Sequence, residues 1–307
     1  MSFGILEEVE AILLVFKGKK ELPTEAECEF DHADVDQATG MVFVAHTSSG
    51  TVEVFDEKEE KWIKSISDCT GGSGVVFDPI TKKVFAASRA DGHILAIDPA
   101  SLSVLIKFKT GSRPNGLAVD SSRGILMTAD VGDNQARFHH QKTGEMIATV
   151  GLIGRPRWCT YSSDSDEYMV NIMDPPGIEF ISGKDFTQTR FFNVNKKGPH
   201  GLVIEGITAY IACDDATLVT IDLKQMKPVL EAKLAGPPDV LWYNRKLNHV
   251  YCSIGEPGVV QVFDGKSLQL IQQIDTEHGS HTLTFDEKLQ KLYTFLPESH
   301  SVGIYRA

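Results

Sequence analysis

The sequence predicts an all-β fold, a seven-bladed β-propeller built from four-stranded antiparallel blades. Two observations predict it: a short motif recurs seven times within 307 residues, and every repeat contains four strand-like segments separated by turn residues. A third observation, the incomplete last repeat, predicts how the ring closes. One domain is expected to span residues 1–307, because the repeats follow one another without a gap.

The recurring motif is seven residues long, carries alternating apolar side chains and ends in an acid or another polar, turn-forming residue. Its copies end 39 to 43 residues apart, and a second apolar motif follows each copy in phase. The copies read FDHADVD, GSGVVFD, PNGLAVD, PRWCTYS, PHGLVIE, PDVLWYN and SHTLTFD. We therefore expect blades that start near residues 31, 73, 115, 157, 200, 239 and 281.

Four strands are expected in each repeat because apolar and polar residues alternate and β-branched and aromatic residues are common. In the first repeat, these segments are residues 33–36, 41–46, 51–55 and 62–66. Turn residues such as Ser48-Ser49-Gly50 separate them, and no interior segment keeps a helical period. A repeat of about 42 residues with four strands is typical of a propeller blade.

The last repeat has only three strands before the chain stops, so blade 7 lacks its outermost strand. A propeller closes its ring to remove open sheet edges, and we expect an N-terminal strand to complete blade 7. The closing segment should come from residues 1–30, with residues 11–17 as the favoured donor. A short leading helix is the alternative, because one helical face would align Ile5, Val9, Leu13 and Phe16.

Three stretches resemble YVTN-type β-propeller repeats, a family that includes scaffolds, binders and enzymes. They read PNGLAVDSSRGILMTAD, GLVIEGITAYIACDDATLVTIDLKQMKPV and HTLTFDEKLQKLYTFLPESHSVGIY. The resemblance extends over nearly the whole chain and implies the propeller fold without implying one activity. The fourth repeat departs from the pattern, since Cys159, Thr160 and Tyr161 stand where aliphatic residues are usual.

Composition excludes several classes of function. The chain carries 30 Lys and Arg against 42 Asp and Glu, a net charge of −12, which argues against binding to nucleic acid or anionic membrane. It has no apolar stretch long enough for a membrane helix, and early acidic residues argue against a signal peptide. The five cysteines form no CxxC pair, so we expect reduced thiols in a cytoplasmic protein, with a monomer favoured.

Candidate site residues lie at the mouth of the predicted central channel, where the innermost strand of every blade begins. The residue five positions before the end of each motif copy is never aliphatic. These seven residues are Asp31, Ser73, Asn115, Arg157, His200, Asp239 and His281. The competing interpretation is structural, because a water-filled channel entrance is polar without having any function.

A divalent metal site is the first functional hypothesis. Blades 5, 6, 7 and 1 are neighbours in a closed ring, and they present His200, Asp239, His281 and Asp31. Imidazoles and carboxylates together suit zinc, manganese, iron or nickel. His32 is a further candidate ligand, although strand alternation places it on the opposite face from Asp31 unless the register shifts by one residue. Taken singly, each histidine fits a structural role better than a metal-binding one.

A basic arc is expected on the other side of the mouth, with Arg89, Arg113, Asn115, Arg155 and Arg157 as candidate substrate-binding residues. Guanidinium groups bind carboxylate and phosphate in bidentate fashion, so the expected partner is a small anionic molecule. The alternative is that these arginines pair with acidic residues nearby, namely Asp91, Asp130 and Asp133.

His46, Asp130 and Glu256 follow second strands near the mouth and are the candidate general acids or bases. The residues favour a small-molecule enzyme, with metal-dependent hydrolysis or elimination (a hydrolase or lyase) as the expected chemistry. Two alternatives stay open, a non-catalytic scaffold for protein interaction and a metal-free binder of small ligands. Cys213 and Cys252 lie on expected second strands and should be buried, so a cysteine nucleophile is not expected.

Overall fold

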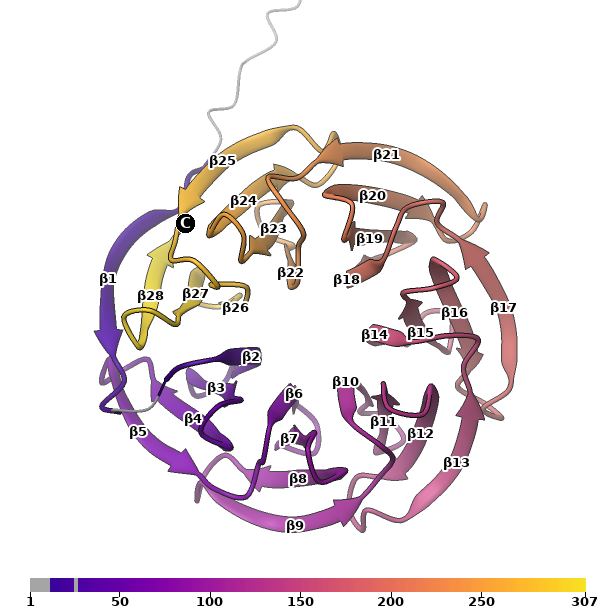
Figure 1. Ribbon diagram of the computed structural model, residues 1–307, viewed down its shortest axis with the longest axis horizontal. Helices are drawn as coiled ribbons and strands as arrows, with labels where there is room; N and C mark the ends of the chain where they lie inside the picture. Colours follow the sequence, from indigo (N-terminus) through magenta and orange to yellow (C-terminus); the bar gives the residue numbers. More distant parts are fainter. Residues whose placement is uncertain (1–11, 25–26) are drawn as a thin grey trace, which may run out of the picture.

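A computed structural model describes residues 12–24 and 27–307 and contains seven four-stranded antiparallel sheets. The sheets are arranged as a ring around a central channel, with one strand of each sheet at the axis and one at the rim (Figure 1). This confirms the predicted seven-bladed propeller. No helix in the described part of the chain is long and apolar enough to cross a membrane.

The strands of blades 1 to 4 run from the channel to the rim in chain order. Blade 1 comprises β2 (Phe30–Asp36), β3 (Met41–His46), β4 (Thr51–Asp56) and β5 (Lys61–Ile66). Blade 2 comprises β6 (Gly72–Asp78), β7 (Lys83–Ser88), β8 (His93–Asp98) and β9 (Ser103–Lys109). Blade 3 comprises β10 (Pro114–Asp120), β11 (Ile125–Asp130), β12 (Gln135–His140) and β13 (Met146–Gly151). Blade 4 comprises β14 (Pro156–Ser162), β15 (Glu167–Ile172), β16 (Gly177–Ser182) and β17 (Gln188–Asn193).

Blades 5 and 6 follow the same order, and blade 7 combines both ends of the chain. Blade 5 comprises β18 (Pro199–Glu205), β19 (Thr208–Cys213), β20 (Thr217–Asp222) and β21 (Lys227–Lys233). Blade 6 comprises β22 (Leu241–Asn244), β23 (His249–Ile254), β24 (Val259–Asp264) and β25 (Leu270–Asp275). Blade 7 comprises β26 (Leu283–Asp286), β27 (Lys291–Leu296), β28 (Ser301–Arg306) and β1 (Val15–Glu21).

The ring closes through β1, which lies antiparallel to β28 at the rim of blade 7 (Figure 1). Val15 lies opposite Arg306 and Glu21 lies opposite Ser301. An N-terminal closing strand is therefore confirmed, but it begins at Val15 and runs four residues beyond the expected end at residue 17. Within the described residues, Phe16 belongs to this strand rather than to a helix, and residues 1–11 lie outside the described part.

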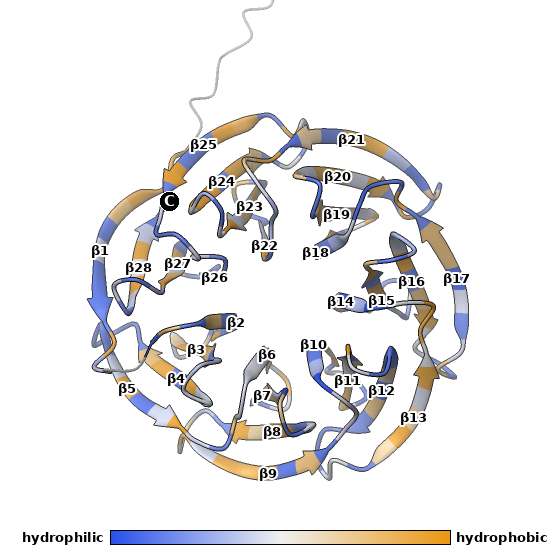
Figure 2. Cartoon of the chain, viewed as in Figure 1, coloured by the Kyte–Doolittle hydropathy of each residue, from blue (hydrophilic) through white to orange (hydrophobic). Residues whose placement is uncertain are grey.

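The core lies between neighbouring blades rather than in one central mass. Apolar side chains of the second and third strands of a blade are almost wholly buried against the next blade, as in the contact of Phe138 with Tyr168 (ring centroids 5.0 Å apart). The second and third strands are accordingly nearly continuous apolar runs, as at residues 42–45 and 94–97, whereas hydropathy alternates along the rim strands and the loops are mostly polar (Figure 2). Each buried side chain of this size stabilises the fold by roughly 1.5–3 kcal/mol, so the blade interfaces hold the ring together.

The innermost strands approach one another closely where they enter the channel. In blades 1 to 5, the ladder between the first and second strands is irregular at this point, as between Gly72 and Val75. Glycine occupies the irregular position in blades 2, 3 and 5. A Cβ atom on Gly74, Gly116 or Gly201 would lie 2.1, 2.7 or 2.5 Å from a carbonyl oxygen of the next blade. Only glycine therefore allows this spacing.

Replacing Gly74 by alanine should force neighbouring inner strands apart. We expect Gly74→Ala to lower the free energy of unfolding by about 1–3 kcal/mol, the usual cost of inserting a methyl group into a packed region. Gly151→Ala is the matched control, because a Cβ there meets no atom within 4 Å. Denaturant unfolding of both variants measures the difference; equal stabilities would contradict the close approach.

Candidate functional site

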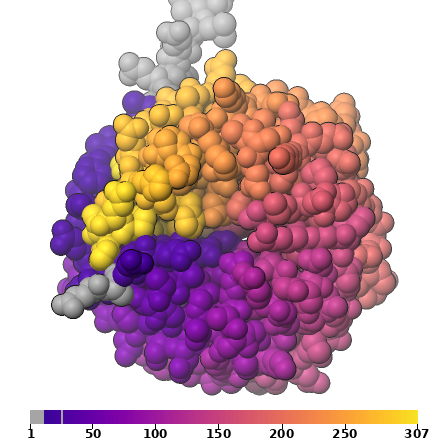
Figure 3. Space-filling model, in the orientation of Figure 1, coloured from indigo at the N-terminus to yellow at the C-terminus, as the bar shows by residue number. Residues whose placement is uncertain are grey.

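The seven polar residues predicted at the mouth do begin the innermost strands or directly precede them. Asp31 and Arg157 lie in β2 and β14, whereas Asp239 and His281 lie just before β22 and β26. These strands surround the axis of the ring (Figure 1). In the space-filling view the blades meet around the axis and leave no wide opening on the face shown (Figure 3). Polar side chains of adjacent blades are thereby brought within contact distance.

Asp31, Asp239 and His281 form a compact group whose possible ligand atoms all lie within 4.8 Å of one another. The Nδ1–H of His281 donates to the carbonyl oxygen of Gly279 at 2.8 Å. This bond leaves the lone pair on Nε2, which lies 3.7 Å from Oδ2 of Asp239. A histidine oriented through Nδ1 in this way can offer Nε2 to a metal ion. Three of the five predicted metal ligands are therefore brought together.

His200 makes ion pairs on both ring nitrogens. Its Nδ1 lies 3.2 Å from Oδ1 of Asp214, and its Nε2 lies 3.1 Å from Oδ1 of Asp239. Burial alone would lower the pKa of this imidazole, but the two carboxylates outweigh burial and raise it to about 9. Burial alone would raise the pKa of Asp239, but His200, with smaller contributions from His281 and His32, holds it below its usual range. His200 is thus an imidazolium at neutral pH.

His32 lies on the same side as Asp31, contrary to the expectation from strand alternation. The irregular pairing of β2 with β3 between Phe30 and Ala33 interrupts the alternation. As a result Nε2 of His32 lies 3.3 Å from Oδ1 of Asp31. The ring of His32 also contacts that of Trp158 from blade 4, with centroids 4.3 Å apart.

Trp158 was not identified as a channel residue from the sequence, although its position in the repeat is unusual for such a large side chain. His32 and Trp158 stand at the position that is glycine in blades 2, 3 and 5. Blades 1 and 4 therefore carry large rings where blades 2, 3 and 5 have no side chain. The contact between the two side chains, which come from blades 1 and 4, fills part of the channel.

The expected pairing of the mouth arginines with acidic neighbours is wrong. The three carboxylates concerned have other partners: Asp91 pairs with Lys107, and Asp130 and Asp133 both pair with Arg137. Among the residues that the structure describes, no ion pair to a carboxylate forms at Arg89, Arg113 or Arg155. Arg157 lies 3.3 Å from Asp214 and 3.1 Å from Nε2 of His200.

The arginines are close enough to affect one another. Burial lowers the pKa of Arg89, and the charges of Arg113 and Arg157 add to this effect while Asp31 opposes it. Burial and the same kind of repulsion lower the pKa of Arg155. The Nε atoms of Arg89 and Arg157 are buried without a hydrogen-bond partner. The half-buried Asn115 begins an inner strand between those of Ser73 and Arg157.

The three candidate acid–base residues are not brought to this cluster by any hydrogen bond or ion pair within the described ranges. His46 is 1% exposed, stacks on Phe30 and lies 3.2 Å from Oε1 of Glu53. Asp130 is buried against Arg137, and Glu256 pairs with His278 at the surface. Their catalytic roles stay predictions.

The cysteines provide no reactive thiol near the mouth. All five are buried, as expected for Cys213 and Cys252, and none of them forms a disulfide within the described part of the chain. Burial raises the pKa of Cys69 and Cys213 to about 12, far from the range of a thiolate nucleophile at neutral pH.

No family model matches the sequence, and no curated protein matches it. Among solved structures, hydrazine synthase from Kuenenia stuttgartiensis is similar, with a TM-score of 0.81 and 13% sequence identity. The match covers 93% of this chain and 97% of that chain. At this identity the likeness supports the propeller fold alone, and the resemblance to YVTN-type repeats stays a prediction.

The charge state of His200 provides a test of the mouth electrostatics. Its folded-state pKa of about 9 exceeds the roughly 6.5 of a free imidazole, so its ion pairs stabilise the fold fully below pH 6.5. This contribution is lost as the pH rises through about 9. We expect a histidine titration by NMR to give a midpoint near 9 in metal-free protein, and Asp214→Asn to lower it by roughly one unit.

Asp185→Asn is the control, because it removes an exposed carboxylate that accepts a hydrogen bond from Thr187 in the turn before β17, and it should leave that midpoint unchanged. A His200 midpoint near 6.5 in the unmodified protein would contradict the arrangement of two carboxylates around this ring.

Proposed function

We propose that the protein is a small-molecule enzyme whose anionic substrate binds at the channel mouth. The observation that supports this most strongly is a group of three arginines that form no ion pair with a carboxylate of the described residues, Arg89, Arg113 and Arg155. Acidic residues outnumber basic ones by 42 to 30, so unpaired arginines gathered at one place stand out. A carboxylate or phosphate group would neutralise them through bidentate hydrogen bonds.

Keeping these guanidinium groups together without a ligand is unfavourable. Arg89 and Arg155 are partly desolvated and repel their neighbours, which is why their pKa values are lowered. The buried Nε–H of Arg89 also lacks an acceptor, and an unmade hydrogen bond of a charged group is costly. A bound oxyanion would remove both penalties, so ligand binding and stability should be strongly linked.

A divalent metal ion is the proposed cofactor, with Asp31, Asp239 and His281 as its ligands. Two carboxylates and one imidazole suit zinc, manganese, iron or nickel, and three protein ligands leave coordination positions for water or substrate. Such an ion would supply Lewis-acid activation of a substrate oxygen or of water. The orientation of His281 by Gly279 favours this assignment. His32, held beside Asp31, would position that carboxylate.

His200 is suited to act as the proton donor. It is held as an imidazolium between Asp214 and Asp239, and it lies beside Arg157. An acid next to an anion-binding group can protonate a leaving oxygen or nitrogen when a bond is cleaved. Hydrolysis or elimination on an anionic substrate is therefore the proposed reaction class, a hydrolase or a lyase.

Ligand-induced stabilisation measures the anion site directly. Citrate and inorganic phosphate should raise the melting temperature, since a ligand at 100 times its dissociation constant stabilises a fold by about 2.7 kcal/mol. The double variant Arg89→Gln/Arg155→Gln should lose at least half of that gain. Arg306→Gln removes an exposed arginine of β28 and should retain it.

Elemental analysis of the same untagged proteins separates the remaining alternatives. Stoichiometric metal that is lost in His281→Ala but kept in His140→Ala, an exposed control histidine, would support the enzyme. Anion binding without metal under any supplementation would indicate the metal-free binder. Neither metal nor anion binding would contradict the proposal and favour the interaction scaffold.

A further inference from the structure

The opposite end of the channel contains a cavity of about 550 Å³. It lies along the inner strands of blades 4, 5 and 6 and reaches the turns that follow them, and no arginine of the basic arc lines it. Its wall includes the aromatic rings of Trp158, Tyr161 and Trp242, and its rim includes Asp164 and Arg245. A volume of this size is typical of small-molecule sites.

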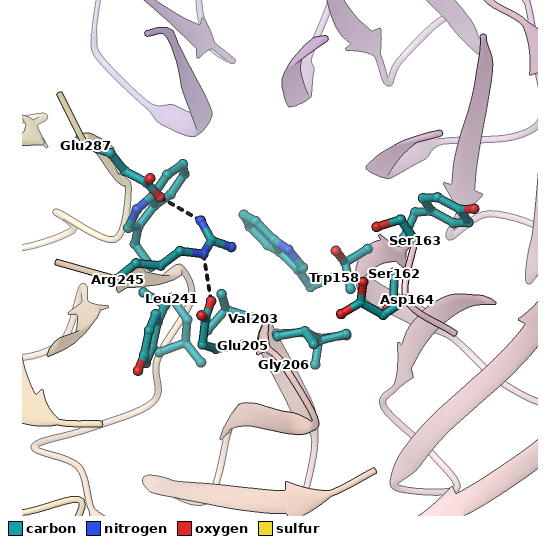
Figure 4. Close-up of a pocket in the computed structure, with 16 residues that line it drawn as sticks. Trp158, Ser162, Ser163, Asp164, Val203, Glu205, Gly206, Leu241, Arg245 and Glu287 are labelled. Carbon is teal, nitrogen blue, oxygen red and sulfur yellow. Dashed lines mark hydrogen bonds and ion pairs between the residues drawn. The ribbon is translucent and has the colours of Figure 1, made fainter. Parts of the chain in front are cut away.

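This end of the channel is acidic. Arg245 is the one basic residue among those that line the cavity, and it is already neutralised. Its Nε lies 2.7 Å from Glu205 and its Nη1 lies 2.9 Å from Glu287 (Figure 4). Asp164 is exposed and, within the described ranges, forms no ion pair. The lining thus carries three carboxylates against one guanidinium.

The surroundings of the cavity reinforce this negative charge. Four other inner strands end at the same level in aspartates, whose oxygens accept backbone N–H groups of the following turns. These residues are Asp36, Asp78, Asp120 and Asp286, of which Asp120 is neutralised by an ion pair with Arg123. A cationic ligand is therefore favoured at this end, in contrast to the anion proposed for the arginine mouth.

Besides negative charge, the cavity has aromatic faces that can contact a cation. Trp158 lies between the ion pairs of Arg245 on one side and Ser162, Ser163 and Asp164 on the other (Figure 4). A smaller neighbouring cavity of about 250 Å³ also has Trp158 and Trp242 in its wall, so both indoles border the open space. Indole faces attract ammonium groups most strongly when the site is partly shielded from water.

We infer that this end of the channel is a second binding site, which takes a small organic cation of the alkylammonium or quaternary ammonium class. The cation lies against Trp158 and Trp242, and Asp164 provides the carboxylate that pairs with it. The inference does not depend on the function proposed for the arginine mouth, because no residue of the basic arc lines this cavity. It adds a ligand of opposite charge at the other end of the same channel.

Tryptophan fluorescence tests this site with choline as the probe. The chain contains three tryptophans, and in Trp62→Phe the emission comes only from the two that line the cavity. We expect a saturable fluorescence change with choline in this variant and in the unmodified protein. The neutral isostere 3,3-dimethylbutan-1-ol has the same shape without the charge and should bind on the order of tenfold more weakly. All titrations are made at constant ionic strength.

Calorimetric titration of variants identifies the residues involved. Asp164→Asn should weaken choline binding on the order of fivefold, and Trp242→Leu on the order of tenfold. Asp185→Asn, the same change at an exposed aspartate outside the lining, should leave the affinity unchanged. Equal binding of choline and its isostere, loss of binding in Asp185→Asn, or no saturable signal would each overturn the inference. Circular dichroism confirms that the variants are folded.

Discussion

The close approach of seven inner strands around one axis is the constraint on which the rest of the structure depends. A Cβ atom on Gly74 or Gly201 would collide with a carbonyl oxygen of the next blade, which shows how little space separates adjacent blades. The first side chain of each inner strand is consequently forced against that of its neighbour, as in the contact of His200 with Asp239. Polar and charged side chains that are far apart in the sequence lie together at the channel mouth because the ring closes.

The same constraint gives the channel two ends of different character. Inner strands begin among histidines, carboxylates and unpaired arginines, and they end among aspartates that accept turn amides. Between these ends, His32 and Trp158 are in contact and fill part of the passage. A ligand at one end therefore encounters a different charge from a ligand at the other.

The sequence was sufficient for the fold, because alternation and turn residues are local signals repeated seven times. It placed the closing strand four residues too early, since β1 is fixed by pairing with β28, which is a long-range interaction. It also predicted Asp31, Asp239 and His281 as neighbours, and their possible ligand atoms lie within 4.8 Å of one another.

Local sequence patterns did not predict which ion-pair partner a charged side chain has, because several oppositely charged residues lie within reach in the folded chain. The sequence could not show that Lys107 pairs with Asp91 or that Arg137 pairs with Asp130. With these carboxylates occupied, Arg89, Arg113 and Arg155 have no ion pair among the described residues, whereas Arg157 pairs with Asp214. The sequence also could not show the irregular pairing that turns His32 toward Asp31.

The most direct test of the central claim, that the mouth arginines bind an oxyanion, is anomalous diffraction from a crystal soaked in selenate. We expect a selenium peak beside Arg89 and Arg155, with selenate oxygens within hydrogen-bond distance of their guanidinium groups. A mouth without a peak would contradict the proposed anion site.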